Sequence, residues 1–250
     1  MLEVRGVSKA FAGVHALEQV ELTVDAGQLV SVIGPNGSGK TTLFNCISGF
    51  LRADAGSIAF RGEEIGARQP FQIARLGLVR TFQSVRLFGK LTALENLVVA
   101  VQQHQGDSTL GRFFRSRSVR RHEAEAIARA LELLDRVKLV AHRDTPAADL
   151  SYGQRKLLSI AAALMPRPQL VLLDEPTAAV NPTAILSIRD LLRELHGEGQ
   201  TILLVEHNME FVMGLSQKVV VLDAGRKIAE GTPAEVRTDR RVLEAYLGGA

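Results

Sequence analysis

The sequence is poor in two things, cysteine and long apolar stretches. Its single cysteine, Cys46, excludes an internal disulfide and fits a reducing compartment. No run approaches the roughly 18 apolar residues that would cross a bilayer. The first residues, 1–5, lack the apolar segment of a signal peptide. We therefore expect a cytosolic chain that meets any membrane through partner proteins.

The composition is that of an ordinary globular protein. The 250 residues are 46% hydrophobic and 23% charged, with a formal net charge of +3. This length allows one large domain, or a domain with a subdomain, around a substantial core. The mild basic bias permits an acidic partner or a membrane surface but does not argue for either.

A glycine-rich turn between an apolar strand and a helix carries the clearest chemistry. Residues 29–33 predict a buried strand, and residues 43–47 continue as a helix. The turn and first helical residues are Gly34, Pro35, Asn36, Gly37, Ser38, Gly39, Lys40, Thr41 and Thr42. This order turns a G-x-x-x-x-G-K-[ST] pattern into a phosphate-binding loop, whereas an isolated match would be only a turn with an exposed lysine. Lys40 would neutralise the terminal phosphates, Thr41 would offer a hydroxyl to Mg²⁺, and backbone N–H groups would surround the anion.

The remaining pattern is that of an α/β protein with a helical insert. Strands are expected over residues 2–7, 18–24, 56–61, 78–82, 170–174, 201–205 and 218–222. Helices are expected over residues 40–49, 71–76, 93–101, 119–134, 151–165, 184–196, 209–215 and 233–247. Strand signals vanish between about residues 87 and 150. In that insert, the basic and aromatic run 112–122 fits stacking on single-stranded nucleic acid, a solvated face or a protein-contact surface, and we favour the last two.

Acidic and histidine side chains follow two of the expected strands. Asp174 ends an apolar run, which is where the carboxylate for Mg²⁺ lies beside a phosphate loop, and Glu175 follows at once. One carboxylate can address the metal while the other polarises an attacking water. His207 follows the strand 201–205 at the same expected sheet edge. A lone histidine is more often packed or simply exposed, but this neighbourhood favours a functional role.

Several motifs in order resemble the nucleotide-binding subunits of ABC transporters over essentially the whole chain. Leu-Ser-Tyr-Gly-Gln at 150–154 is similar to the family signature, and Thr-Phe-Gln at 81–83 to the Q-loop. The resemblance implies an α/β fold with a P-loop NTPase (RecA-like) core, an N-terminal antiparallel β subdomain and an inserted α-helical subdomain. It divides a single ATPase domain, 1–250, into a core of 1–86 and 155–250 and a helical subdomain of 87–154 that carries the signature.

The same resemblance implies a dimer that closes on two ATP molecules and reopens after hydrolysis. Each ATP would be held by the phosphate loop of one subunit and by Ser151, Gly153 and Gln154 of the other. Phe11, which local pattern alone assigns to the core, would instead stack on adenine.

The resemblance also implies the catalytic and metal-binding roles. Asp174, Thr41 and Gln83 would hold Mg²⁺. Glu175 would act as general base or orient the water, and His207 would hold the γ-phosphate. Gln83 would also sense metal and water at the hinge to the helical insert.

Two departures from the usual family pattern narrow the resemblance. Tyr152 replaces the first glycine of the signature, and residues 178–181 read Ala-Ala-Val-Asn, so Asn181 supplies no charge across the dimer. Both features resemble the ATPases of branched-chain amino acid importers, as do residues 79–88, the polar insert after Val101 and the ending 244–248. That insert most resembles the longer, LivG-like ATPases.

The leading hypothesis is therefore an ATP-hydrolysing motor subunit of a branched-chain amino acid importer. It would lie peripherally on the cytoplasmic face of the inner membrane. Its partners would be two polytopic permease subunits, a second ATPase that is a paralogue or another copy, and indirectly a substrate-binding protein, with no nucleic acid. The alternatives are a related ATPase for urea, amides or a lipid-linked glycan, and a soluble ABC ATPase acting on DNA or ribosomes.

Overall fold

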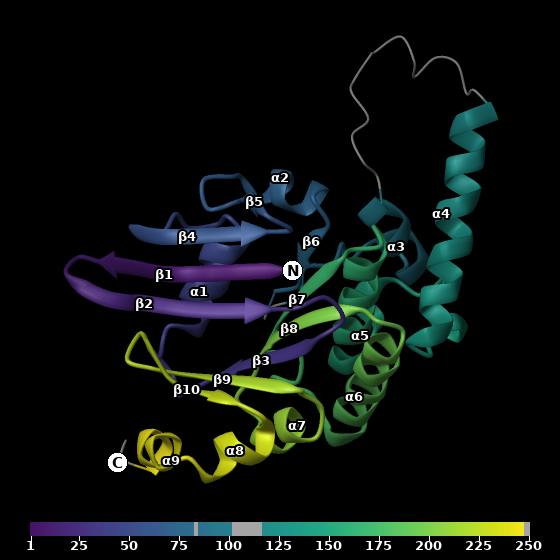
Figure 1. The fold of residues 1–250 in the computed structure, drawn as a ribbon. Helices are drawn as coiled ribbons and strands as arrows, with labels where there is room; N and C mark the ends of the chain where they lie inside the picture. Colours follow the sequence, from purple (N-terminus) through teal and green to yellow (C-terminus); the bar gives the residue numbers. More distant parts are fainter. Residues whose placement is uncertain (83–84, 102–116, 248–250) are drawn as a thin grey trace. The chain divides into compact units, whose positions relative to one another are not determined.

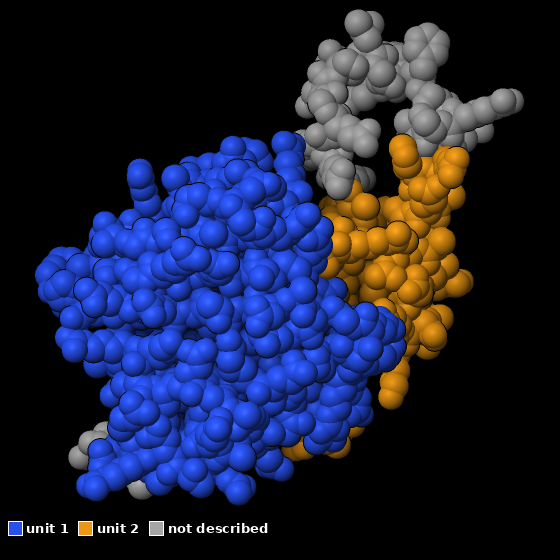
Figure 2. Space-filling view, viewed as in Figure 1, with its two compact units in different colours: residues 1–83, 169–179, 188–250 blue, residues 84–168, 180–187 orange. Residues whose placement is uncertain are grey.

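The computed structural model describes residues 1–82, 85–101 and 117–247. Gln83 and residues 112–116 of the run 112–122 lie outside these described residues. The chain forms two compact units (Figure 2). The first comprises residues 1–83, 169–179 and 188–250, and the second comprises residues 84–168 and 180–187.

A six-stranded sheet forms the centre of the first unit, with β3 (Leu29–Ile33) near its middle. The strand order is β10-β9-β3-β8-β7-β6, and every pairing is parallel except that of β10 with β9. The other strands are β6 (Leu78–Arg80), β7 (Leu170–Asp174), β8 (Thr201–Val205), β9 (Lys218–Asp223) and β10 (Arg226–Gly231). Every residue of β3, β7 and β8 is buried, as their continuous apolar runs predict for strands covered on both faces. Their predicted bounds are confirmed.

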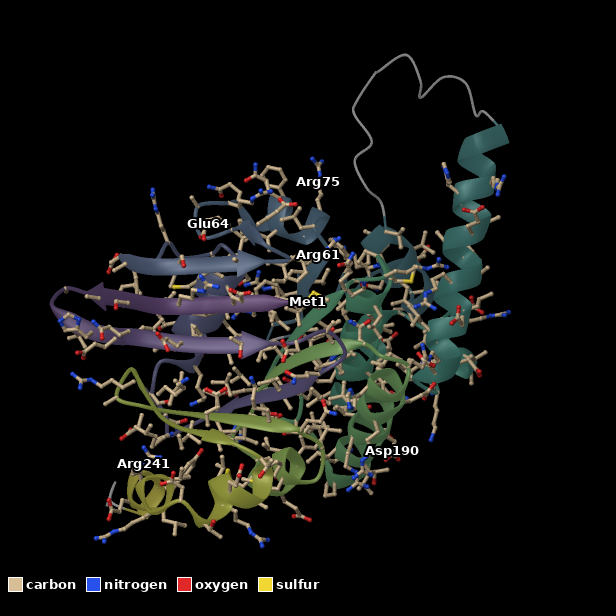
Figure 3. The ribbon with its side chains drawn as sticks, in the orientation of Figure 1. Met1, Arg61, Glu64, Arg75, Asp190 and Arg241 are labelled. Atoms are coloured by element: carbon tan, nitrogen blue, oxygen red, sulfur yellow. The ribbon has the colours of Figure 1, made fainter. Side chains whose placement is uncertain are left out.

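A second, antiparallel sheet confirms the predicted N-terminal β subdomain. Its order is β2-β1-β4-β5, formed by β1 (Leu2–Phe11), β2 (Val14–Val24), β4 (Ala55–Phe60) and β5 (Glu63–Glu64). Val4 pairs with Leu22 on one side and with Ile58 on the other, and all three are buried in the core. At one end the Arg61 amide donates to the Met1 carbonyl oxygen across 2.8 Å, and both residues are labelled in Figure 3.

Helices flank the six-stranded sheet of the first unit. They are α1 (Lys40–Ile47), α2 (Pro70–Arg75), α7 (Met209–Met213), α8 (Pro233–Thr238) and α9 (Arg240–Leu247). The C-terminal helices α8 and α9 pack on β10 (Figure 1). Val236 of α8 and Val242 of α9 share a buried cluster with Ile33, the last residue of β3. The C-terminal helices thus pack against the strand that leads into the phosphate loop.

The second unit is helical, as expected for the insert. It contains α3 (Ala93–Val101), α4 (Arg117–Arg136), α5 (Tyr152–Leu164) and the first residues of α6 (Pro182–Gly197), which ends in the first unit. Short 3₁₀ turns at Val140–His142 and Ala147–Asp149 connect α4 to α5. The side chain of Asn96 fixes the start of α3. Its oxygen accepts from the backbone N–H of Phe88, and its nitrogen donates to the backbone carbonyls of Leu91 and Thr92. None of the helices in the described part of the chain is long and apolar enough to span a bilayer.

Candidate functional site

The phosphate loop needs glycine at two positions for steric reasons. Gly34 has φ +153°, and a Cβ there would lie 2.0 Å from the Leu222 carbonyl oxygen. Gly39 has φ +101°, and a Cβ there would lie 2.4 Å from the Ala16 carbonyl oxygen. Neither conformation nor space admits a side chain. The loop is therefore pressed against β2 and β9 and held in one conformation.

The N-terminus of α1 is left free of negative charge. Gly39 is its N-cap, no side chain caps the first N–H groups, and the first turn has no acidic residue. The unsatisfied N–H groups and the helix dipole therefore make this end favourable for an anion.

Lys40 is buried within the loop. Its ammonium donates to the carbonyl oxygens of Gly34 and Pro35, each at 2.8 Å. Burial lowers the pKa of Lys40, and the nearby carboxylates of Glu175 and Asp174 oppose part of that shift. The lysine and both predicted carboxylates thus lie close enough together to interact.

Strand register explains how these groups meet. Val32 of β3 and Asp174 of β7 both pair with Val205 of β8, so three adjacent parallel strands end level with one another. The phosphate loop, Glu175 and His207 follow these three ends. In open α/β sheets this carboxyl edge is where ligands bind. His207 Nδ1 lies 3.9 Å from Glu175 Oε2, and the two side chains are 55% and 17% exposed.

Glu175 has an unusual backbone conformation. Its φ is +46°, in the left-handed region that a non-glycine residue rarely occupies, and its amide donates to the Val205 carbonyl oxygen across 2.9 Å. Such strain persists only where surrounding structure enforces it, and it clusters at functional sites.

Glu206 enforces part of this arrangement, a role that the sequence analysis did not assign to it. Its side chain is fully buried. Oε1 accepts from the amide and hydroxyl of Thr177 at 2.8 and 2.7 Å, and Oε2 accepts from the amides of His207 and Asn208 at 3.1 and 3.4 Å. One carboxylate therefore fastens the segment after Glu175 to the segment that carries His207.

Arg80 is the second residue that the sequence analysis missed. Its Nη2 donates to Asp174 Oδ2 across 2.7 Å, and both side chains are almost completely buried, at 5% and 6% exposure. Asp174 thus already has a buried cationic partner. The available signal was a charged residue at the end of a short apolar strand, which requires a buried counter-charge.

The signature residues belong to the second unit. Ser151 is the N-cap of α5 and forms a capping box with Gln154, which confirms the predicted helix N-terminus. A Cβ on Gly153 would lie 2.7 Å from the Ala184 Cβ, so close packing requires glycine there. Asn181, where the family usually has aspartate, accepts from the Ala184 amide at 2.9 Å. Its amide oxygen thus bonds to the start of α6.

The predicted adenine contact lies on the surface. Phe11 ends β1 with 45% of its area exposed, and the Lys9 ammonium lies 5.5 Å from its ring centroid. An exposed ring beside a cation is free to stack on a base.

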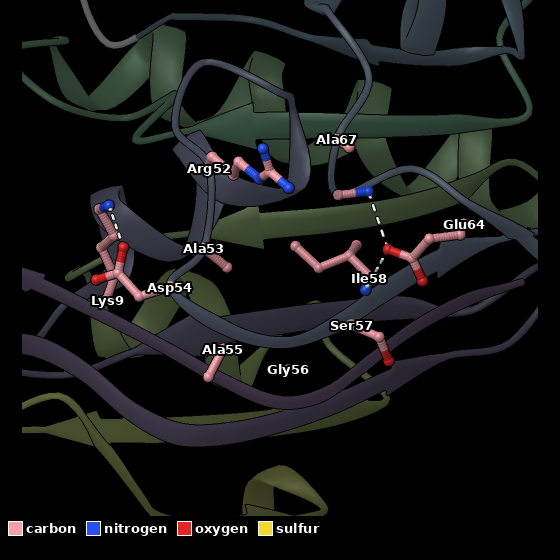
Figure 4. Close-up of a pocket in the computed structure, with 11 residues that line it drawn as sticks. Lys9, Arg52, Ala53, Asp54, Ala55, Gly56, Ser57, Ile58, Glu64 and Ala67 are labelled. Atoms are coloured by element: carbon pink, nitrogen blue, oxygen red, sulfur yellow. Dashed lines mark hydrogen bonds and ion pairs between the residues drawn. The ribbon is translucent and has the colours of Figure 1, made fainter.

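A cavity of about 870 Å³ opens elsewhere in the first unit (Figure 4). It is lined by the segment 52–58 with Lys9, Glu64, Gly66 and Ala67, and by none of the predicted nucleotide-binding residues. Lys9 is paired with Asp54, and Glu64 Oε1 accepts from the amides of Ile58 and Gly66. These bonds occupy three of the four charged side chains that line the cavity.

The oxygen donors at the sheet edge fit Mg²⁺ that arrives with a nucleotide. Mg²⁺ is usually bound by one or two carboxylates together with substrate phosphates and waters. Asp174 and the exposed Thr41 are groups of this kind. In the part of the chain that the structure describes, no cluster of three or more acidic, histidine or cysteine residues could hold a metal alone.

Comparison with known proteins identifies the family of the chain. Residues 17–178 match the family model described as ABC transporter, and residues 226–250 match the model described as branched-chain amino acid ATP-binding cassette transporter. The chain is 43% identical to the high-affinity branched-chain amino acid transport ATP-binding protein BraF of Pseudomonas aeruginosa, over 100% of this chain and 98% of that protein. It is 40% identical to LivG of Escherichia coli K12, with the same coverage.

Solved structures show the same fold. The ADP conformation of MJ1267, an ATP-binding cassette of an ABC transporter, has a TM-score of 0.86 and 36% identity, covering 99% of this chain and 98% of that one. A nucleotide-free cassette has a TM-score of 0.85 and 35% identity, covering 98% of both chains. The chain therefore belongs to the ABC transporter family, as an ATP-hydrolysing cassette of the group that contains BraF and LivG.

Proposed function

We propose that this cassette drives a branched-chain amino acid importer by hydrolysing Mg²⁺-bound ATP at the carboxyl edge of its six-stranded sheet. The observation that carries the proposal is the level ending of β3, β8 and β7, which gathers Lys40, Asp174, Glu175 and His207. The cargo is inferred from the printed names of BraF and LivG together with the C-terminal match.

Each chain residue has a defined task in this mechanism. The amides of the phosphate loop and Lys40 bind the β- and γ-phosphates, and Phe11 stacks on adenine. Asp174 and Thr41 would hold Mg²⁺, and the ion would supply positive charge to neutralise the phosphates. Gln83, which lies outside the described residues, would complete the metal site in this proposal.

Glu175 and His207 act on the reacting atoms. Glu175 orients the attacking water and accepts its proton, while His207 donates a hydrogen bond to the γ-phosphate. Their closest atoms lie 3.9 Å apart, so the two side chains can act side by side, one on the attacking water and the other on the γ-phosphate.

A second cassette completes the site. Ser151, Gly153 and Gln154 of one subunit would meet the γ-phosphate bound by the other, with the N-terminus of α5 adding positive potential. We propose that residues 87–154 form the helical subdomain that passes this closure to two polytopic permease subunits. The chain would sit peripherally on the cytoplasmic face of the inner membrane, coupled indirectly to a substrate-binding protein.

The catalytic part of the proposal is tested by Glu175→Gln. Turnover should fall at least 100-fold, because an amide cannot accept the proton from water. ATP affinity should stay within about twofold, and ATP should still produce a stable dimer. Glu18→Gln is the matched control, since Glu18 is an exposed carboxylate paired with Arg226. Undiminished hydrolysis in the Glu175 variant would remove Glu175 from the mechanism.

The transport part is tested by purifying the chain from its native membranes in mild detergent. Two polytopic membrane proteins and a second ATPase should accompany it, and the reconstituted assembly should import leucine, isoleucine or valine. Import of urea, an amide or a lipid-linked glycan instead would replace the proposed cargo. Ribosomal proteins or nucleic acid in place of membrane proteins would reject the transporter function.

A further inference from the structure

Arg80 joins three elements of the first unit. It is the last residue of β6, and its Nη1 donates to Asn45 Oδ1 of α1 at 2.7 Å and to Ser48 Oγ at 2.9 Å. Ser48 is the C-cap of α1, the helix that begins in the phosphate loop. The other terminal nitrogen of Arg80, Nη2, donates to Asp174 Oδ2 at the end of β7, at 2.7 Å. One guanidinium therefore links the phosphate-loop helix, the strand before Gln83 and the proposed metal ligand.

Aromatic rings enclose this guanidinium. The ring centroids of Phe82, Phe44 and Phe50 lie 5.4, 5.7 and 5.9 Å from its central carbon. Phe50 and Phe82 also contact each other edge to face at 5.4 Å. A cation placed among ring faces is stabilised, and exclusion of water strengthens its bonds to oxygen.

The contacts of Arg80 depend on the planar, forked shape of its guanidinium group. A guanidinium directs two nitrogens along fixed, diverging directions, so Nη1 reaches α1 while Nη2 reaches β7. A lysine would keep the positive charge but would have only one nitrogen, on a flexible stem. The backbone also joins the end of β6 to β7, because the Thr81 amide donates to the Leu172 carbonyl oxygen at 2.9 Å.

We propose that Arg80 is a positioning residue for Asp174. It holds Asp174 Oδ2 at a fixed position relative to α1, so that the carboxylate is oriented before Mg²⁺ and nucleotide arrive. This inference rests on the proposed role of Asp174 in holding the metal. It assigns Arg80 no contact with nucleotide. Its effect is on how readily the metal is bound.

The test is Arg80→Lys, which keeps the charge and removes the fork. Binding of a fluorescent ATP analogue is measured at equilibrium as Mg²⁺ is titrated, beside the wild type, Asp174→Asn and the double variant. Arg80→Lys should raise the half-saturating Mg²⁺ concentration about tenfold, the lower end of what loss of a ligand's supporting partner costs. Affinity for the analogue in EDTA should change less than about twofold. Arg226→Lys is the control, because Arg226 also forms a forked pair, with the exposed Glu18.

The double variant identifies the route of the effect. With Asp174→Asn already present, Arg80→Lys should not shift the Mg²⁺ midpoint further, since coupled residues are not additive. A shift below twofold for Arg80→Lys, beside a clear shift for Asp174→Asn, overturns this inference and leaves the proposed function standing. No shift for Asp174→Asn overturns the metal role of Asp174 and this inference with it.

A milder variant covers the case in which Arg80→Lys fails to fold. Asn45→Ala removes one anchor of Nη1 and leaves Arg80 and Asp174 in place. It should move the Mg²⁺ midpoint in the same direction by a smaller factor. A folded Asn45→Ala protein with an unchanged midpoint would overturn the inference as well.

Discussion

Replacing Glu206 with glutamine tests whether one buried carboxylate holds the catalytic edge together. The substitution keeps the size of the side chain but turns one of its two acceptor oxygens into a donor. The wild-type oxygens accept four hydrogen bonds, two each. The new amide nitrogen destabilises the folded state least when it faces Thr177, because the threonine hydroxyl can rotate and accept a hydrogen bond from it. The Thr177 amide is then left without an acceptor.

The expected loss follows from those bonds. A hydrogen bond to a charged group contributes about 1.5–3 kcal/mol, and a buried unsatisfied N–H costs about 1–3 kcal/mol. Relief of the cost of burying a charge offsets part of this sum. We expect a net loss of about 2–4 kcal/mol in the free energy of unfolding. At about 2–4 °C per kcal/mol for a chain of this size, Tm should fall by roughly 5–15 °C.

Activity should fall more than binding does. The segments that carry Glu175 and His207 lose their common anchor, so kcat should drop about tenfold or more, whereas the phosphate loop is untouched and the Kd for ATP should stay within about twofold. Calorimetry, an ATPase assay and an ATP titration measure the three quantities. Glu64→Gln is the control, because Glu64 also accepts two backbone amides but is exposed. A Tm within 2 °C of wild type together with unchanged kcat would refute the reasoning.

Two further predictions concern the phosphate loop and its helix. Gly39→Ala should lower Tm more than Gly13→Ala does. Both glycines have left-handed φ, but only a Cβ on Gly39 would meet another atom, at 2.4 Å. Equal melting temperatures would show that the loop can shift to accept the methyl group. Burial raises the pKa of the Cys46 thiol to about 11, with Asp54 adding to the shift and Lys9 opposing it, so iodoacetamide at pH 8 should label Cys46 only after denaturation. Since the unfolded thiol ionises near 9.0, its contribution to stability should be constant below that pH and decline as pH rises toward about 11. Labelling of the folded protein at the rate of a free thiol would contradict this assignment.

The fold was predictable wherever burial leaves a local pattern. The strands at 29–33, 170–174 and 201–205 are mostly apolar runs, each preceded by glutamine and followed by glycine or glutamate, and the structure gives them the same bounds. No bounds were predicted for the strand Arg226–Gly231. It is an edge strand of mixed polarity, with one side unpaired, so its residues show neither an apolar run nor clean alternation.

The parts of the site that join distant segments were not predictable in the same way. The phosphate loop and Asp174 with Glu175 can be recognised because their chemistry lies in contiguous residues. Arg80 and Asp174 are 94 residues apart, and Thr177 and Glu206 are 29 apart. A charged residue at the end of a buried strand signals that a partner must exist. Local periodicity does not say which partner, because that depends on strand order.

Strand order also bears on how the protein is made. Both neighbours of β3 lie far downstream: β8 begins at Thr201 and β9 at Lys218. At about 5–20 residues per second, a ribosome needs roughly 10–30 s to add the segment between β3 and β8. Throughout that interval the apolar Leu29–Ile33 segment has both hydrogen-bonding edges unpaired, a condition that favours aggregation. The nascent chain therefore carries the phosphate-loop sequence long before it can form the sheet around it, and this interval is when a chaperone would be most useful to it.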